Sequence, residues 1–507
     1  MHRGLFRLVL FCAFIVIAAA SGKAQDSVTL KVMSFNIWYG GEQVSFAKVI
    51  EAIKAADPDI IGLQEPDGNT AKLAEAAGYP YVDTRRHIIS RYPIFDSGLG
   101  EAPASPGLVY SLNGVAPDAV HAWILVRPGK VVAMANTHLT SDPYGPEAVR
   151  DGKSLDEVLK IETETRLPEA QPIADALGKL AKARVPLFLT GDFNSPSHLD
   201  WTKEAQEKRK EIKFPVMWPA SKLFADSGLT DSYRALRPDP AKDPGLTWTP
   251  GYPAPYVRAE ETHDRIDMIW SANAKPVASV IAGETGNSDV AIAIDPWPSD
   301  HRAVVSTFDV VPMDAPAMIT IEPRPVLARQ DFRIRVNMPD KSDWTAVIVP
   351  RGGDPKSDAM TGIANVGFWE RPTIKLVIPD IEAGEFDAVL LNKEGKELAR
   401  TQFTLAEPGA RPEISTDKDS YKPGEKIKIK FANAPGNKYD WIAVYARGDA
   451  NVYNYLGYVY TNARFNGSVI IDESVFSEPL PQGEYELRLL KDDHYAVQAV
   501  AYITVRD

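Results

Sequence analysis

One local pattern recurs within the first 310 residues of this 507-residue chain: a short apolar run that ends in a side chain bearing oxygen or nitrogen. LKVMSFN ends at Asn36, DIIGLQE at Glu65, VVAMANTH at His138 and PLFLTGDFN at Asn194. Apolar runs of this length, bounded by polar residues, are typical of buried strands. The pattern therefore predicts several buried strands whose ends present polar groups.

Segments with helical spacing separate some of these runs. Ser45 is a candidate N-cap for a helix that Asp57-Pro58 should end, and residues 164–183 predict a longer helix. Alternation of buried strands with helices is typical of a layered α/β domain. We therefore expect residues 26–310 to form such a domain, with a second kind of structure beyond it.

The pattern changes after residue 310. VPMDAPAM, residues 311–318, contains two prolines and is predicted to be a linker. Beyond it, short alternating stretches lie between turn residues, and DWTAVIV at Asp343 returns as DWIAVYA at Asp440, a period of about 98 residues. The repeat predicts two tandem β-sandwich modules, at residues 319–407 and 411–507.

The N-terminus has the features of a secretory signal peptide over residues 1–24. Basic Arg3 and Arg7 precede an apolar run that ends at Ala20, and Ala24 provides a small residue for cleavage. No later stretch has the roughly 18 apolar residues that spanning a membrane requires. We therefore expect a secreted or periplasmic protein without a transmembrane segment after signal removal.

The polar residues at or beside the predicted strand ends form a candidate site. In layered α/β folds such loops converge, so residues remote in sequence can share one pocket. Their carboxylate and amide oxygens suit Mg²⁺, Mn²⁺ or Ca²⁺, and an imidazole beside a carboxylate is an acid or base near neutral pH. Phosphate-ester hydrolysis needs both functions. The residues are Asn36, Glu65, His138, Asp192, Asn194, Asp267, Asp300 and His301.

The ordered set of motifs around these residues resembles a known superfamily. SFNIWYGG, IIGLQE, SRYPI, NTHL, GDFN, HDRID and PSDHRAVV are similar to motifs of the endonuclease/exonuclease/phosphatase superfamily, over residues 28–310. That superfamily contains pancreatic-type DNases, apurinic-site endonucleases, inositol polyphosphate 5-phosphatases and neutral sphingomyelinases. The resemblance implies a secreted, bacterial-type member whose catalytic domain is a four-layer α/β sandwich, two packed mixed sheets flanked by helices.

The resemblance also implies a metal site. Glu65 is similar to the principal ligand of a divalent cation, Mg²⁺ or Mn²⁺ with Ca²⁺ as a further candidate. Asn36 would lie beside it, and Asp300 would add another carboxylate on the metal side.

For the remaining residues the resemblance implies catalytic roles. Asp192 would orient or deprotonate the attacking water, Asn194 would bind a phosphate oxygen and His301 would contact the scissile phosphate. Asp267 would fix the tautomer of a histidine, and His138 matches a second histidine of the DNase and sphingomyelinase branches. The alternatives are structural: Asp192 and Asn194 could close a turn, and Asp267 could pair with Arg265.

Two long polar inserts, residues 140–164 and 195–230, follow candidate catalytic residues. Connections of this length without secondary structure of their own are uncommon unless they serve a site. They offer candidate residues for a substrate pocket. These are Tyr144, Arg150, Ser197, His198 and Trp201.

Charge guides the choice of substrate. The chain has a net charge of −12, and residues 26–310 alone carry about −10, whereas nucleic-acid binders usually have a basic surface. We therefore expect a phosphodiesterase that hydrolyses a small, lipid-headgroup or sugar phosphate by in-line attack of water. A secreted nuclease acting on DNA or RNA is one alternative.

A surface-binding protein with an inactive enzyme domain is a second alternative. The two β modules contain no catalytic constellation in their sequence, so we expect them to bind or space, with a cell-surface or polymer ligand. Trp344 and Trp441 recur at the same place in the repeat and predict core positions.

Overall fold

The computed structural model describes most of the chain, and the predicted signal peptide lies outside the described residues. None of the helices in the described part combines the length and apolar character needed to cross a membrane. The described residues are 27–97, 120–248, 261–322, 326–365, 373–377, 381–436, 440–461, 464–476, 478–492 and 495–506.

The α/β domain contains two mixed sheets. The first has the order β12-β11-β13-β1-β2-β4-β3, with β1 parallel to β2 and antiparallel to β13. Its strands are β1 (Val28–Asn36), β2 (Ile60–Gln64), β3 (Tyr81–Asp83), β4 (Ile88–Ser90), β11 (Ala274–Gly283), β12 (Val290–Ala293) and β13 (Ala303–Val310).

The second sheet has the order β5-β6-β7-β8-β10-β9, and β14 pairs with β7. Because β14 comes from the predicted linker, that segment extends the second sheet. The strands are β5 (Ile94–Asp96), β6 (His121–Arg127), β7 (Lys130–His138), β8 (Leu187–Asp192), β9 (Thr230–Asp231), β10 (Asp267–Ala272) and β14 (Met313–Asp314).

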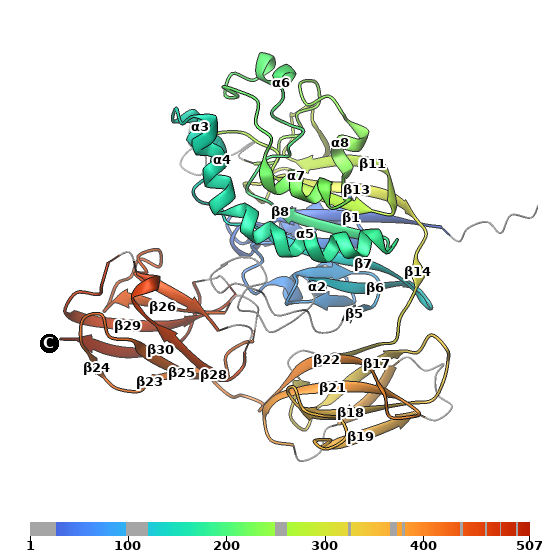
Figure 1. Cartoon of the computed structure of the whole chain (residues 1–507), viewed down its shortest axis with the longest axis vertical. Coiled ribbons are helices and arrows are strands. Elements are labelled where there is room, and N and C mark those ends of the chain that lie inside the picture. The colour runs from blue at the N-terminus through green and yellow to red at the C-terminus, as the bar shows by residue number, and fades with distance from the viewer. Residues whose placement is uncertain are drawn as a thin grey trace, which may run out of the picture.

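Three apolar cores hold these sheets and their helices in four layers. Val32 of the first sheet and Met134 of the second share the core between the sheets. The helices α1 (Phe46–Ala56) and α2 (Thr70–Ala77) cover the outer face of the first sheet, and α5 (Arg166–Lys182) and α7 (Pro219–Asp226) cover that of the second (Figure 1). The predicted four-layer α/β sandwich is confirmed, and α1 begins after the predicted cap, Ser45.

The two inserts contain helices of their own. Two helices lie in the first, α3 (Gly145–Arg150) and α4 (Leu155–Glu164). The second contains α6 (Lys203–Lys208) and α7, and the short α8 (Ser232–Leu236) follows it. Trp201 and Trp218 pack with Val149 and Val158 in a small core that joins both inserts. The inserts contain many polar surface residues, so their composition did not indicate this core.

The two C-terminal modules have matching topologies. Module 1 has sheets ordered β15-β17-β20 and β16-β22-β21-β18-β19, and module 2 has sheets ordered β23-β25-β28 and β24-β30-β29-β26-β27. The predicted pair of β modules is present (Figure 1).

The module 1 strands are β15 (Met318–Glu322), β16 (Val326–Leu327), β17 (Asp331–Asn337), β18 (Trp344–Pro350), β19 (Thr361–Asn365), β20 (Thr373–Val377), β21 (Gly384–Asn392) and β22 (Glu397–Ala406). The module 2 strands are β23 (Glu413–Thr416), β24 (Ser420–Tyr421), β25 (Ile427–Ala432), β26 (Trp441–Ala446), β27 (Gly457–Tyr460), β28 (Gly467–Ile471), β29 (Gly483–Leu490) and β30 (Val497–Val505).

The repeated tryptophans lie on opposite faces of their sheets. Trp344 packs in the core of module 1, as predicted, whereas Trp441 is buried on the face of its sheet that points away from the module 2 core. Trp441 is six positions before Arg447, but Trp344 is seven positions before the corresponding Arg351, and both arginine N–H groups donate to the carbonyl of the equivalent glutamate, Glu484 and Glu385. A shift of one residue turns every side chain of a strand to the other face.

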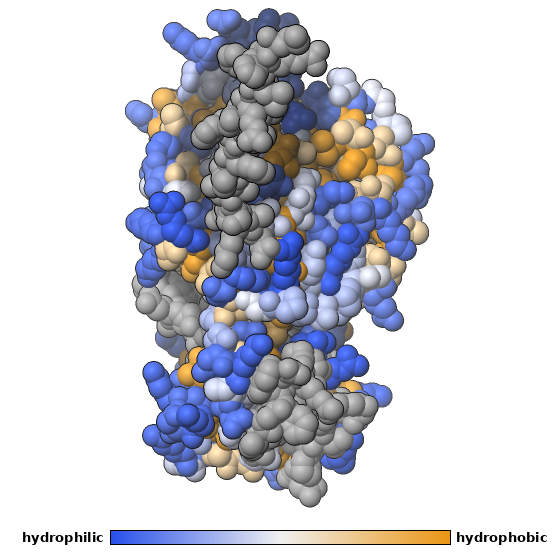
Figure 2. Space-filling model, turned by 90° about the vertical axis from the view of Figure 1, so that its right-hand side faces the viewer, coloured by the Kyte–Doolittle hydropathy of each residue, from blue (hydrophilic) through white to orange (hydrophobic). Residues whose placement is uncertain are grey.

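Both modules contact the α/β domain. The Asp492 carboxylate of module 2 accepts a hydrogen bond from the Gly68 N–H at 3.1 Å and lies 3.6 Å from Nε2 of His87. In module 1, Thr401 donates to Asp96. Figure 2 shows that the surface facing the viewer is largely hydrophilic, with hydrophobic residues gathered in patches on the upper part.

Candidate active site

Three neighbouring strands of the second sheet bring their polar ends together. Strands β7 and β8 are parallel, so His138 is the register partner of Asp192. Strand β10 is antiparallel to β8 and places Asp267 beside Asp192 from the other side. Asp192 is thus central, and all three side chains come from the edge of one sheet.

The first sheet supplies the other half of the site. Strands β1 and β2 are parallel and end together, so Asn36 lies beside Gln64, and Glu65 follows. Since β13 is antiparallel to β1, its first residues lie near the end of β1, and Asp300 and His301 precede it directly. The Ser299 hydroxyl ties this turn to β1 by donating to the Asn36 carbonyl at 2.7 Å.

A glycine lets the two sheets approach closely behind the site. A Cβ atom at Gly62 would lie 1.9 Å from Oγ1 of Thr190 and 2.4 Å from Oδ1 of Asn136. Asn136 then bridges the sheets, because it accepts from Gln64 at 2.6 Å and donates to the Leu63 carbonyl at 2.7 Å. The sequence analysis missed these residues; the only signal was a polar residue within each apolar strand.

Asn36 connects the two halves of the site. Its Nδ2 donates to Oε1 of Glu65 at 3.1 Å and to Oδ2 of Asp192 at 3.0 Å. The other oxygen of Asp192 accepts from the Asn194 N–H at 2.9 Å. Glu65 and Asn194 have φ values of 51° and 46°, a region that non-glycine residues seldom adopt and that clusters at functional sites.

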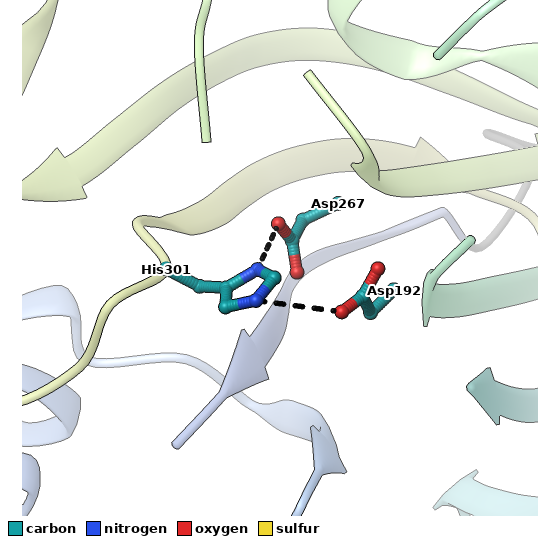
Figure 3. Close-up of side chains that lie close together, drawn as sticks. All are labelled: Asp192, Asp267 and His301. Atoms are coloured by element: carbon teal, nitrogen blue, oxygen red, sulfur yellow. Dashed lines mark hydrogen bonds and ion pairs between the residues drawn. The ribbon is translucent and has the colours of Figure 1, made fainter. Parts of the chain in front are cut away.

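His301 lies between two carboxylates, as Figure 3 shows. Its Nδ1 is 2.9 Å from Oδ2 of Asp267, and its Nε2 is 3.6 Å from Oδ2 of Asp192. The Asp267 bond places a proton on Nδ1 and directs Nε2 toward Asp192. The structure does not contain the alternative Asp267–Arg265 pair, because Arg265 binds Asp200 and Asp231 instead.

His138 is the second imidazole beside Asp192, with its Nε2 at 3.4 Å from Oδ2. Burial opposes its charge, but the hydrogen bond and negative charge of Asp192 outweigh burial and raise the pKa of His138 to about 9. For His301, Asp267 and Asp192 likewise overcome burial and raise its pKa well above the usual value. Burial alone would raise the pKa of Asp192, yet the two imidazoles lower it to about 2.

The acidic groups fit a hard divalent cation. Burial and the charge of Glu65 raise the pKa of Asp300 to about 7, although His301 acts in the opposite direction. Oδ1 of Asp267 has no hydrogen-bond partner among the described residues. Ligand atoms of Asp192, Asp267 and His301 also lie within 4.8 Å of one another, but the bonds of His301 to both carboxylates favour a proton there. Glu65 and Asp300 are therefore the better oxygen ligands, and Asn36, whose Oδ1 accepts from the Trp38 N–H at 3.0 Å, lies beside them and holds Glu65.

A cavity of about 540 Å³ opens at this cluster. Asn36 and Asp267 lie just behind its lining, where they hold the residues that face it. Asn194 faces it, and so do five carboxylates and imidazoles of the candidate set, which are called the carboxylate wall below. They are Glu65, His138, Asp192, Asp300 and His301. The ring of Trp248, which the sequence analysis missed, packs on His301 with centroids 4.7 Å apart.

Of the five pocket residues predicted from the inserts, Tyr144 lines the cavity. In the described part of the chain the other four lie outside its lining. Arg150 pairs with Glu147 and Asp151, and Trp201 is buried with its Nε1 donating to Asp264. The Ser197 hydroxyl accepts from the Leu199 N–H, and the His198 ring stacks on Trp270. These side chains hold the inserts in place.

The fold and the site define an α/β protein equipped for phosphate-ester chemistry. The sequence profile described as the Endonuclease/Exonuclease/phosphatase family matches residues 33–301. The chain belongs to this family, whose members are hydrolases that act on phosphoester bonds.

An uncharacterized protein of Caenorhabditis elegans is 29% identical over 298 residues, 56% of this chain and 92% of that protein. Among solved structures, an endonuclease/exonuclease/phosphatase from Beutenbergia cavernae is 18% identical with a TM-score of 0.34, covering 74% of this chain and 100% of its own. An AP endonuclease from Archaeoglobus fulgidus is 18% identical with a TM-score of 0.35, covering 55% and 100%.

Proposed function

We propose that this protein is an exported, divalent-metal-dependent phosphodiesterase that acts on a small, lipid-headgroup or sugar phosphate. The observation that carries the proposal is the convergence of Asp192 with two imidazoles and the Asn36–Glu65 pair at one cavity. Strand ends from both sheets meet at this cavity, and they bring acid, base and oxygen ligands together. Hydrolysis at phosphorus uses all three.

Glu65 and Asp300 would hold the cation, with Asn36 beside Glu65. When bound, a cation such as Mg²⁺ or Mn²⁺ supplies positive charge to the phosphate oxygens. Asn194, whose Nδ2 donates to the Leu139 carbonyl at 2.8 Å and lies 3.1 Å from Nε2 of His138, would turn its amide to a phosphate oxygen when substrate binds. His301, fixed by Asp267, presents Nε2 to the scissile phosphate.

The reaction is an in-line displacement by water. Asp192 accepts a hydrogen bond from the attacking water and takes its proton as the new O–P bond forms. The P–O bond to the leaving group breaks on the opposite side, and an imidazolium of the carboxylate wall donates a proton to the departing oxygen. One water is consumed, and the products are a phosphate monoester and an alcohol.

The charge of the cavity favours a compact substrate over a nucleic acid. Eight carboxylates line the cavity, against two arginines, Arg85 and Arg86. Both arginines are paired with Asp96, and Arg86 also with Asp83. A long polyanion gains affinity from unpaired basic residues around the cleft, and this lining does not offer them.

A substrate panel tests the proposal. The purified chain would be incubated with Mg²⁺, Mn²⁺ or a chelator and offered a chromogenic phosphodiester and monoester, inositol phosphates, choline phospholipids, DNA and RNA. We expect metal-dependent turnover of a small diester. Turnover of nucleic acid alone would support the nuclease alternative, and no turnover of any substrate would favour a binding protein.

Export is a separate part of the proposal and is supported by the sequence of residues 1–24. Mass spectrometry of the protein recovered from a secreting host should find a mature N-terminus near residue 25. An intact Met1 on cell-retained protein would overturn export and leave the enzymatic proposal untouched.

A further inference from the structure

The cavity has a second wall that comes from module 2. Five aromatic residues of this module line the same cavity as the carboxylate wall, and we call them the aromatic wall: Trp441, Tyr455, Tyr458, Tyr460 and Tyr495. The residues of the two walls are distributed along the chain from Glu65 to Tyr495, which are 430 positions apart. Docking of module 2, through Asp492 and Gly68, is what brings them together.

Tyr39 connects the two walls. Its backbone N–H donates to Oε2 of Glu65 at 3.2 Å, and its side chain lines the cavity. Burial raises the pKa of the Tyr39 phenol, and the charges of Glu65 and of Tyr453 in module 2 add to this. Tyr39 thus lines the cavity together with residues of both walls.

The rings of the aromatic wall meet at right angles. Trp441 lies 5.4 Å from Tyr455, 5.5 Å from Tyr458 and 5.6 Å from Tyr495, with interplanar angles of 83°, 82° and 79°. These three contacts are all edge-to-face. We call this group of mutually perpendicular rings the box; the rings contact one another, so a cation would lie on the faces that they turn to the cavity and not between them.

The charge around the box has the sign that attracts a cation. The cavity lining contains eight carboxylates, and besides the catalytic ones these include Asp67, Asp142 and Asp492. One divalent metal ion would neutralise only part of this charge. An alkylammonium group gains from both features, since ring faces and carboxylates are each attractive to positive charge.

Module 1 shows that the repeat does not require such a box. The strand beside β18 reads TGIAN, whereas its counterpart beside β26 reads GYVY. The preceding loop is RGGDPKSDAM in module 1 and RGDANVYNYL in module 2. Tyr455 in the latter loop is 37% exposed and lines the cavity.

We infer that the aromatic wall of module 2 is the substrate-recognition half of the active site and binds the alkylammonium group of a zwitterionic phosphodiester. The inference rests on the proposed phosphodiesterase function and adds the substrate class. The phosphate would lie at the carboxylate wall and the ammonium group in the box.

Two chromogenic diesters that differ in one atom test this. One is 4-nitrophenyl phosphocholine, and the other is 4-nitrophenyl 3,3-dimethylbutyl phosphate, in which carbon replaces the ammonium nitrogen. In both, water adds to phosphorus, the P–O bond to 4-nitrophenol breaks and a phosphate monoester remains. The full chain with Mg²⁺ or Mn²⁺ should prefer the ammonium ester by about tenfold in kcat/KM, as a partly desolvated cation–π box provides.

Substitutions assign the preference to the wall. Tyr455→Ala and Tyr495→Ala should each reduce the ratio of the two kcat/KM values toward 1, whereas Tyr455→Phe should keep it because the ring face remains. Tyr502→Ala is the matched control: Tyr502 is 53% exposed on β30 of the same module, and its ring packs on Arg447. A wild-type ratio near 1, or a ratio that Tyr455→Ala leaves unchanged, would overturn the inference.

A binding measurement separates failure of the inference from failure of the proposed function. Phosphocholine should quench tryptophan fluorescence saturably in the wild type and much less in Tyr455→Ala, whether or not the chain is active. Quenching without hydrolysis of either ester would contradict the proposed function and support binding of the ammonium group by the aromatic wall. Hydrolysis of both esters with neither quenching nor preference would support the proposed function and contradict the inference.

The ammonium group could belong to a free diester or a lipid. Glycerophosphocholine in solution and phosphatidylcholine vesicles distinguish these sources, with phosphocholine or its parent alcohol as the product. Turnover of either supports the inference and assigns the source. Hydrolysis of the chromogenic ester alone, without turnover of either, would count against it.

Discussion

The two walls of the cavity differ in almost every physical respect. The carboxylate wall is built from strand ends of two packed sheets, and its side chains are buried, charged and hydrogen-bonded to one another. The aromatic wall comes from a loop and strands of an appended module, and its rings contact one another by their edges. The difference leads to the proposal that reaction and selection are separable here, with the first wall governing the rate of P–O cleavage and the second governing which diester is bound.

The largest effect should come from Asp192, the centre of the carboxylate wall. Asp192→Asn removes the proton acceptor, so kcat should fall about 10³-fold or more on both chromogenic esters, with their ratio preserved. Steady-state kinetics checks this, and Asp226→Asn, an exposed aspartate on α7, is the control. A changed ratio of the two kcat/KM values with retained kcat would mean that Asp192 acts in substrate selection and not in P–O cleavage.

Metal removal should come next. Chelation should lower turnover of both esters at least about 10²-fold, since the cation stabilises charge on phosphorus oxygens, and added Mg²⁺ or Mn²⁺ should restore it. Glu65→Gln should raise the metal concentration needed for half-maximal rate, while Glu51→Gln on the exposed face of α1 should not. Full activity after exhaustive chelation would show that hydrolysis does not need a cation.

Asp267 should have a smaller effect because it acts through His301. Asp267→Asn keeps the shape but loses the carboxylate that holds the imidazole, and a loss of 10- to 100-fold in kcat is expected for such a supporting group. NMR of the His301 ring should show a changed tautomer or a lower pKa. An unaltered His301 spectrum with full activity would contradict the positioning role.

The smallest effect concerns a histidine outside both walls. Burial, together with the charge of Arg86, lowers the pKa of His121 to about 3, while the unfolded chain has the ordinary value of about 6.5. The unfolded state therefore binds a proton as pH falls below 6.5, and stability is lost progressively from there toward pH 3.

His121→Phe removes that proton uptake. Between pH 7 and pH 5, the unfolding free energy of the wild type should fall by about 1 to 2 kcal/mol more than that of the variant. Urea titration at both pH values measures this difference. An identical pH dependence in the two proteins would show that His121 is already protonated in the folded state. The contrast with His138, whose carboxylate neighbour raises its pKa, would then be lost.

The sequence predicted the layered fold and the strand-end residues because both have local signals. A buried strand needs an apolar run, and a polar residue at its end is visible without knowledge of the partner strand. Asn36, Glu65 and Asp192 were found in this way, and strand pairing then explains why they meet.

The aromatic wall could not be predicted, because it depends on docking between distant parts of the chain. Nothing near Tyr455 or Tyr495 indicates that Gly68 will bind Asp492 and bring these rings to the cavity. The prediction for Trp441 failed for another reason. The DW motifs of the two modules align in sequence, but the strand register differs by one residue, which places Trp441 on the other face of its sheet. Trp201 was misplaced because a tryptophan in a core and one in a pocket look alike in sequence.

Hydrolysis in H₂¹⁸O is the most direct test of the central claim that the carboxylate wall directs water to phosphorus. With Mg²⁺ or Mn²⁺, the wild type should place the label in the phosphate monoester produced from 4-nitrophenyl 3,3-dimethylbutyl phosphate, and the chelated wild type and Asp192→Asn should release little product of any kind. Label in 4-nitrophenol, or equal product from all three samples, would contradict it.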